Sequence, residues 1–129
     1  SRYLKEVSRF ILDYPTDFYT SVKRHELLAI LGIGAETADC ILLYACDQTH
    51  FVVDDYSLRI LSRFGLLEKE SSYQEVQRFF ETSLPLDIEL YKCFHALLVE
   101  HAKRICRSKP LCQSCVLKLK CAYALNIRI

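Results

Sequence analysis

Apolar residues recur at helical spacing along nearly the whole chain, and this pattern limits the fold more than any other feature. In "RYLKEVSRFIL", near the N-terminus, apolar side chains fall three or four residues apart, as one face of a helix requires. The same spacing continues in "AETADCILLYAC" and "SLRILSRFGLL", and the one strand-like run, "HFVVD", is short. With only three Gly and three Pro among 129 residues, few positions interrupt a helix. We therefore expect an all-α fold with short loops.

Four of the seven cysteines gather near the C-terminus in the pattern C-x5-C-x2-C-x5-C, at Cys106, Cys112, Cys115 and Cys121. Without a secretory context, reduced thiols and a metal site are favoured over a disulfide framework. Four thiolates in one loop can ligate a 4Fe-4S cube, whereas zinc more often takes two close pairs. Since only Cys112 and Cys115 form such a pair, an iron-sulfur cluster is favoured, with zinc and then unligated thiols as the alternatives. The other three thiols lie in apolar helical patterns, where we expect small buried core residues: Cys40, Cys46 and Cys93.

Basic charge is concentrated at the C-terminal end of the chain. Residues 101–129 hold seven basic residues and no acidic one, whereas residues 1–100 hold ten basic and 16 acidic residues. A basic tail on an acidic body indicates an anionic partner, most often nucleic acid; a solvated polar face is the alternative. The basic residues of the tail are Lys103, Arg104, Arg107, Lys109, Lys118, Lys120 and Arg128.

The sequence has neither a leader nor a membrane span that we can identify. No apolar run approaches twenty residues, and no basic segment followed by an apolar one opens the chain. We expect a cytoplasmic protein, associated with the nucleoid in a bacterium or located in the nucleus of a eukaryote. Because the chain begins with Ser1 and contains no Met, we also expect an N-terminal portion to be missing.

A glycine-containing turn stands between two helical patterns in "LLAILGIGAETADCILLYA". Gly32 and Gly34 flank Ile33, and Thr37 falls in the first turn of the second helix. Glycine lets the backbone turn tightly and approach another molecule closely, and the amides at a helix N-terminus can bind phosphate. The turn is a candidate phosphate site, although an ordinary αα-hairpin would need the same glycines.

About twenty residues after this turn comes "FVVDDYSLRI", in which Asp54 follows two valines. Together the hairpin, the VD motif and the C-terminal cysteines resemble the helix-hairpin-helix DNA glycosylases of the endonuclease III superfamily. The likeness runs from about residue 23 to 121 and includes "EHAKRICRSKPLCQSC" before and within the cysteine pattern. It implies a partial helix-hairpin-helix glycosylase domain over residues 1–105, followed by a 4Fe-4S loop and tail over 106–129.

The resemblance implies that Asp54 is the catalytic aspartate of the VD motif. A fixed carboxylate can stabilise the positive charge that develops on the sugar when an N-glycosidic bond is hydrolysed. The alternative is that Asp55 acts and Asp54 only caps a helix. Bifunctional relatives keep a nucleophilic lysine two residues after the second hairpin glycine, where this chain has Glu36, which cannot form a Schiff base. We therefore expect a monofunctional base-excision-repair glycosylase.

The segments "GIGAETAD" and "FVVDDYS" look most like the branch of 3-methyladenine DNA glycosylases, which implies an alkylated purine as substrate. The implied partner is double-stranded DNA with a damaged base, and we expect a monomer without membrane association. Two alternatives stay open: an endonuclease III-type glycosylase with AP lyase activity, and a non-catalytic helix-hairpin-helix module that only binds DNA.

In the resembling family the cysteine cluster is structural and stiffens a loop whose basic residues contact the DNA backbone. Lys118 and Lys120 are further candidates for such contacts. His101 matches a histidine found in the family just before the cluster, and an ordinary packing role explains it equally well. The implied DNA-binding residues are Gly32, Ile33, Gly34, Thr37, Arg107 and Lys109. The implied metal ligands are Cys106, Cys112, Cys115 and Cys121.

Overall fold

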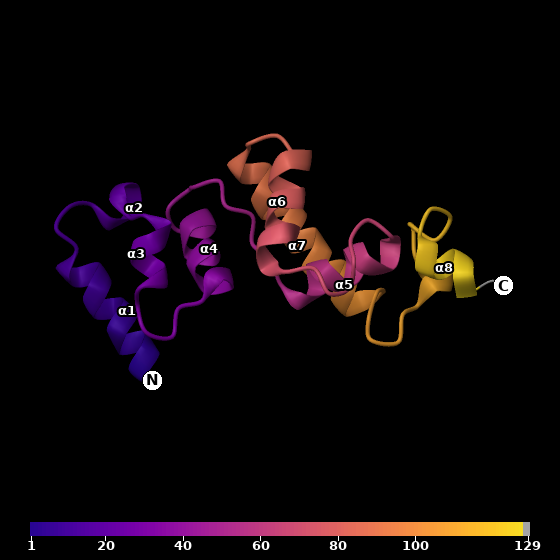
Figure 1. Cartoon of the computed structure of the whole chain (residues 1–129), viewed down its shortest axis with the longest axis horizontal. Coiled ribbons are helices and arrows are strands. Elements are labelled where there is room, and N and C mark those ends of the chain that lie inside the picture. Colours follow the sequence, from indigo (N-terminus) through magenta and orange to yellow (C-terminus); the bar gives the residue numbers. More distant parts are fainter. Residues whose placement is uncertain (128–129) are drawn as a thin grey trace.

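The computed structural model describes residues 1–127, and these form helices joined by short loops without a β-strand, as the sequence predicts. Figure 1 shows the first four helices at one end of the molecule and α8 at the other. Arg128, counted above in the basic tail, lies outside the described residues. The elements are α1 (Arg2–Asp13), α2 (Phe18–Ser21), α3 (Arg24–Leu28), α4 (Ala35–Tyr44), α5 (Asp55–Phe64), α6 (Tyr73–Ser83), α7 (Ile88–Arg104), the 3-10 turn η1 (Cys112–Ser114) and α8 (Ala122–Ile127).

The first four helices share one small hydrophobic core. Helix α1 forms over the predicted segment but buries none of its residues fully; Phe10 and Ile11 pack partly against this core. Helix α4 supplies the two core residues Ala38 and Leu42, and it packs against α3. The core's buried residues are Phe18, Val22, Leu27, Ala38 and Leu42.

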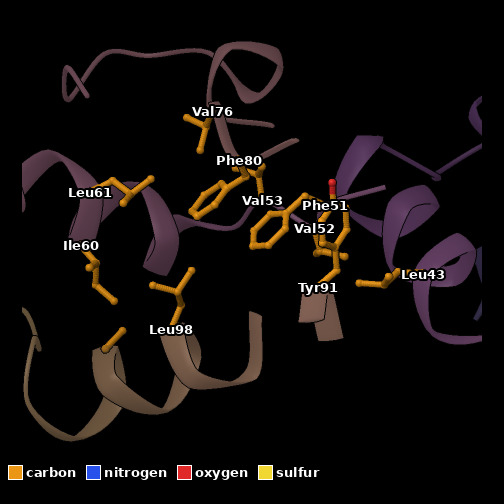
Figure 2. Close-up of a cluster of buried hydrophobic side chains, with 11 residues drawn as sticks. Leu43, Phe51, Val52, Val53, Ile60, Leu61, Val76, Phe80, Tyr91 and Leu98 are labelled. Carbon is orange, nitrogen blue, oxygen red and sulfur yellow. The ribbon is translucent and has the colours of Figure 1, made fainter. Parts of the chain in front are cut away.

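A larger core lies among α4, α5, α6 and α7, and Figure 2 shows it in close-up. The rings of Phe51 and Phe80 stack with their centroids 4.0 Å apart, and Tyr91 meets Phe51 edge-on. Leu43, next to Leu42 on α4, points into this second core, so α4 joins the two cores. Each fully buried leucine contributes roughly 2 kcal/mol through the hydrophobic effect.

The strand-like run does not form a strand. Residues 51–54 are extended and mostly buried, and side chains of α6 satisfy their backbone in place of a neighbouring strand. The amide of Phe51 donates to Glu81 Oε2 at 2.9 Å, and its carbonyl accepts from Gln77 Nε2 at 2.9 Å. The amide of Val53 donates to the Tyr73 hydroxyl at 3.3 Å. The apolar character of this run therefore reflects burial of its side chains, without pairing to another strand.

A buried carboxylate ties the two cores together. Asp39 of α4 is fully buried and accepts two hydrogen bonds from Arg24, with Nε at 2.7 Å and Nη2 at 3.0 Å. The Tyr73 hydroxyl and the Gln77 amide also donate to it, at 2.7 and 2.8 Å. These donors compensate the cost of burying the charge, and removal of one partner of such a pair typically costs about 3–5 kcal/mol.

Two of the cysteines expected in the core are exposed, so that prediction was wrong. Cys40 lies on the stripe of α4 that also carries Glu36 and Tyr44, away from the buried stripe of this helix. Cys93 is exposed on α7, and Cys46 is half-buried. An apolar pattern along a helix does not by itself tell which of its residues face the core. No helix within residues 1–127 is long and apolar enough to cross a membrane.

Candidate active site and cysteine loop

Asp54 is the N-cap of α5, and a reciprocal pair of hydrogen bonds fixes it there. Its Oδ1 accepts from the backbone amide of Ser57 at 2.8 Å, and its own amide donates to Ser57 Oγ at 3.0 Å. This capping box occupies only one carboxylate oxygen. The two roles weighed for this residue, helix cap and catalytic carboxylate, are therefore compatible. Asp55 follows as the first helical residue and is exposed.

The second oxygen of Asp54 meets a histidine that sequence analysis did not single out. His95 of α7 places Nε2 3.1 Å from Asp54 Oδ2, and the two side chains are only 15% and 12% exposed. Burial acts to raise the pKa of Asp54, but the hydrogen bonds from His95 and Ser57 outweigh it and hold that pKa below its usual value. Asp54 is thus ionised at neutral pH in a largely water-excluded position.

A pocket of about 240 Å³ opens in front of Asp54, between the start of α4, the start of α5 and α6. Three carboxylates line it: Glu36, Asp54 and Asp55. The pKa of Glu36 is raised, first by partial burial and then by the negative charges of Asp54 and Asp55. The pocket therefore contains two carboxyl groups with opposite pKa shifts. The pKa of Asp54 is lowered and that of Glu36 is raised.

The glycine turn forms the predicted hairpin between α3 and α4. Gly32 has φ +86°, in the left-handed region, and an added Cβ would collide with the ring of Tyr3. Gly34 is the N-cap of α4, and nothing lies within 4 Å of the position where its Cβ would be. Ile33 packs partly into the N-terminal core, whereas Thr37 is exposed on the first turn of α4. Gly34 and Thr37 thus face open space, and Ile33 anchors the turn.

The four C-terminal cysteines line one cavity, in the loop between α7 and α8. Burial raises the pKa of the Cys112 thiol, and the other three thiols raise it further, so each of them lies within electrostatic reach of Cys112. Within residues 1–127, no three His, Cys, Asp or Glu side chains are arranged around a single-ion position. A 4Fe-4S cube makes a different demand, because each of its four thiolates binds a different iron.

Several hydrogen-bond donors point at these sulfurs. Arg63 Nη1 lies 3.4 Å from Cys106 Sγ, and the amide of Leu117 donates to Cys115 Sγ at 3.4 Å. His101 Nε2 is 3.6 Å from the same Cys115 sulfur, so the histidine singled out in the sequence does contact the cysteine group. Donors directed at sulfur stabilise thiolate ligands in metal centres.

Two arginines of α5 hold the cysteine loop against the helix that begins at Asp54. Arg59 donates to the carbonyls of Ala102 and Cys106 at 3.0 and 2.9 Å, where α7 ends. Arg63 donates from Nη1 to the Arg107 carbonyl at 2.6 Å, and from Nη2 to the next carbonyl at 3.1 Å. Sequence analysis missed both. Their spacing of four residues was visible, but their carbonyl acceptors lie more than 40 residues away.

The predicted phosphate contacts of this loop are exposed. Arg107 and Lys109 both project from the segment between the first two cysteines, and Lys120 is exposed near the last one. Lys118 differs, because its ammonium group donates to the carbonyl of Gln113 at 3.0 Å and so braces the loop itself.

Comparison with known proteins connects these features to one family. No model of a protein family matches the chain. The chain is 47% identical over 126 residues to a Methanocaldococcus jannaschii protein described as a DNA repair glycosylase, which covers 92% of this chain. It is 34% identical over 129 residues to endonuclease III of Sulfolobus acidocaldarius, which covers 98% of this chain. The chain belongs to the helix-hairpin-helix DNA glycosylases of the endonuclease III superfamily.

Solved structures of this superfamily share the fold of the chain. A trapped endonuclease III–DNA covalent intermediate superposes with a TM-score of 0.81 at 22% identity, covering 99% of this chain and 59% of that one. The H. pylori 3-methyladenine DNA glycosylase bound to 1,N6-ethenoadenine gives a TM-score of 0.71 at 34% identity, covering 80% of this chain and 55% of that one. The chain spans 57% of each of the two curated glycosylase relatives above.

Proposed function

We propose that the full-length protein is a DNA glycosylase that hydrolyses the N-glycosidic bond of a damaged base in double-stranded DNA. The observation that carries this proposal is the ionised, hydrogen-bonded carboxylate of Asp54 in a pocket beside the helix-hairpin-helix turn. Such an enzyme acts where the DNA is, in a nucleoid or a nucleus. It would act as a monomer, since one chain supplies Asp54, the hairpin and the cysteine loop.

The chemistry suits a single fixed carboxylate. Water adds to the anomeric carbon, the bond to the base nitrogen breaks, and its electron pair leaves with the base. One proton of the water passes to a carboxylate or to solvent. Positive charge develops on the sugar as the bond breaks, and the negative charge of Asp54, poorly screened in a largely buried position, would stabilise it.

A monofunctional reaction is the simplest one for this pocket. Covalent chemistry on an abasic sugar needs an amine to form an imine, and Glu36 occupies the position where the hairpin of bifunctional relatives carries a lysine. Among the described residues, no lysine lines the pocket in front of Asp54. We therefore propose that the product is an abasic site in an intact strand.

An alkylated purine is the proposed substrate. Alkylation at a ring nitrogen gives the base a positive charge, which weakens the glycosidic bond and suits the negative potential of Glu36, Asp54 and Asp55. The H. pylori neighbour, a 3-methyladenine DNA glycosylase, supports this choice because it is 34% identical over the matched region.

A 4Fe-4S cluster is the proposed cofactor of the cysteine loop. Four thiols lining one cavity, with N–H and guanidinium donors directed at two of the sulfurs, form a suitable donor set. Cys106, Cys112, Cys115 and Cys121 would hold the cluster. When bound, it would supply a structural crosslink for residues 106–121, and catalysis would stay with the residues of the pocket.

The hairpin and the loop are the proposed contacts to the DNA backbone. The amides at the start of α4, beside Gly34 and Thr37, are suited to a phosphate, and Arg107 and Lys109 add positive charge. Gly34→Ala should weaken binding to duplex DNA with little change in melting temperature, because the new methyl group meets no protein atom. Gly32→Ala is the matched contrast and should lower the melting temperature, because of its positive φ and the ring of Tyr3.

The decisive experiment is a base-release assay with the full-length protein. Methylated duplex DNA, duplexes with oxidised pyrimidines and adenine mispairs are incubated with enzyme, and free base and strand breaks are measured separately. We expect release of 3-methyladenine without strand cleavage and no covalent adduct after borohydride treatment. An adduct that survives denaturing electrophoresis would establish the AP lyase alternative. Tight binding to DNA without release of any base would leave only the DNA-binding module.

A further inference from the structure

Two side chains in series, one from α7 and one from α4, connect to the oxygen of Asp54 that the helix cap leaves free. His95 from α7 contacts Oδ2 through Nε2 at 3.1 Å. Its other ring nitrogen, Nδ1, lies 2.7 Å from the hydroxyl of Tyr44 on α4. The rings of His95 and Tyr44 are also in contact, with centroids 5.8 Å apart. A continuous chain of hydrogen bonds therefore runs from α4 through α7 to the N-cap of α5.

The direction of these hydrogen bonds follows from which groups can donate. An ionised carboxylate only accepts, so His95 Nε2 must carry a hydrogen. In neutral imidazole Nδ1 then has to accept, and the Tyr44 hydroxyl is the donor within reach. Burial raises the pKa of Tyr44, which keeps this phenol protonated. With Nε2–H directed at Asp54, the Tyr44 hydroxyl completes the hydrogen bonding of the neutral ring and orients it.

This chain of contacts is separate from the contacts that start the helix. The capping box between Asp54 and Ser57 uses Oδ1 and two backbone amides, and it needs neither His95 nor Tyr44. If the contact to Oδ2 were lost, α5 would still begin at the same residue. The carboxylate would lose only the donor on its second oxygen.

We propose that His95, oriented by Tyr44, is a positioning residue for Asp54. It fixes the orientation of the carboxylate and supplies a donor to it in a pocket that Glu36 and Asp55 also line. The proposal rests on the proposed glycosylase function, because it assigns a role within that reaction. His95 itself does not contact the substrate in this role.

Removal of the imidazole from the full-length enzyme tests the proposal. His95→Ala should lower kcat for base release on the order of 10- to 100-fold, because the carboxylate is no longer held in place. KM and melting temperature should change little. The acid limb of the kcat profile should move to higher pH, because Asp54 loses a hydrogen bond that lowers its pKa. His95→Gln, which keeps an N–H donor, should restore most of the rate.

Tyr44→Phe tests the second link, because it keeps the ring and removes only the hydroxyl. It should lower kcat several-fold because the His95 ring loses the contact that orients it, while 15N chemical shifts should still report a hydrogen on Nε2, facing Asp54. The matched controls are His25→Ala and Tyr19→Phe, at exposed positions of α3 and α2. Both controls should behave as wild type.

The 13C titration of the Asp54 carboxyl group separates failure of this proposal from failure of the proposed function. If the protein releases no base at all, the glycosylase function is wrong, yet an Asp54 pKa that rises in His95→Ala would still support the positioning role. An Asp54 pKa and a kcat profile unchanged in His95→Ala would overturn it. A loss of kcat that follows the melting temperature and that glutamine does not restore would also overturn it.

Discussion

The Asp54 corner, formed by Asp54, Ser57, His95 and Tyr44, and the cysteine loop, residues 106–121, are held in place in different ways. At the corner, residues of α4, α5 and α7 are joined by hydrogen bonds of 2.7 to 3.1 Å. The same helices contribute buried residues to the larger hydrophobic core. The loop has a single 3-10 turn, and its Val116 and Leu119 are 90% and 70% exposed. Its main anchors are arginine contacts to its carbonyl groups. The polypeptide alone can thus position the carboxylate, whereas the loop has little core of its own, and the proposed cluster would supply the missing crosslink.

Asp54→Asn gives the largest expected effect. It tests whether the helix-capping role of Asp54 can be kept while its proposed catalytic role is lost. Asparagine also caps helices, so melting temperature should fall only slightly. The rate of base release should drop by about 10²- to 10⁴-fold, because the charge that stabilises the transition state is gone. Single-turnover assays on methylated duplex DNA measure this, with Asp55→Asn as control. A dead Asp55→Asn beside an active Asp54→Asn would transfer the catalytic role to Asp55.

Removal of the proposed cluster should destabilise the cysteine loop and leave the structure around Asp54 unchanged. Purified protein should be brown and contain iron and acid-labile sulfide. After chelation under oxidising conditions, or in Cys112→Ser, amide hydrogen exchange over residues 107–120 should accelerate by roughly tenfold or more, equivalent to about 1.4 kcal/mol. The amide of Ser57, in the capping box, should keep its protection. Stoichiometric zinc without colour in anaerobically prepared protein would show that the loop binds zinc and not an iron-sulfur cluster. Unchanged hydrogen-exchange rates in the loop would show that the loop, like the residues around Asp54, is held in place by the polypeptide alone.

Arg63→Lys sharpens the comparison at the junction of the two regions. A lysine keeps the charge but cannot reach two neighbouring carbonyls and a sulfur together, as the guanidinium does. The loop should lose about 1–3 kcal/mol of local stability and release iron faster on dilution into chelator. Arg78→Lys, at an exposed position of α6, is the matched control. Equal rates of iron release from the two variants would show that Arg63 does not clamp the loop.

Glu36→Gln should have the smallest effect, and its sign depends on pH. A carboxyl group whose pKa is raised in the folded state destabilises the protein once it is ionised, so the variant should be slightly more stable at pH 7.5. The gain should stay below about 1 kcal/mol, because Glu36 is largely exposed. It should shrink as pH falls towards 5 and Glu36 takes up its proton. Thermal melts across this range measure it, with the exposed Glu70→Gln as control; a gain that grows on acidification would contradict the assigned electrostatics.

Much of the fold could be predicted from sequence, because the spacing of apolar residues is a local property. The helix over 2–13 and the all-α class are as expected. The extended run at 51–54 was not resolved from sequence, because its hydrogen bonds go to side chains of α6 more than 20 residues away. The division into residues 1–105 and 106–129 stays a prediction, although α7 does end at Arg104.

The candidate site divides in the same way. Asp54 stands out in the sequence because it follows two valines about twenty residues after the glycine turn. The four cysteines stand out because they recur at short spacings. His95 stood in an apolar helical run, where one histidine carries no signal of its own. Tyr44 looked like one more aromatic residue of a helix. Neither could be connected with Asp54, because their spacing along the chain says nothing of which helix faces meet.

The helices, the glycine turn, the cysteine pattern and the position of Asp54 next to two valines could all be read from the sequence, since each depends on residues close together in the chain. The packing of the helices was needed to show that Asp54 caps α5 with one oxygen and contacts His95 with the other. It also decided that Arg59 and Arg63 connect that same helix to the cysteine loop. The physical reason is that hydrogen bonds act over about 3 Å, and packing of the helices is what brings residues more than 40 positions apart to that distance.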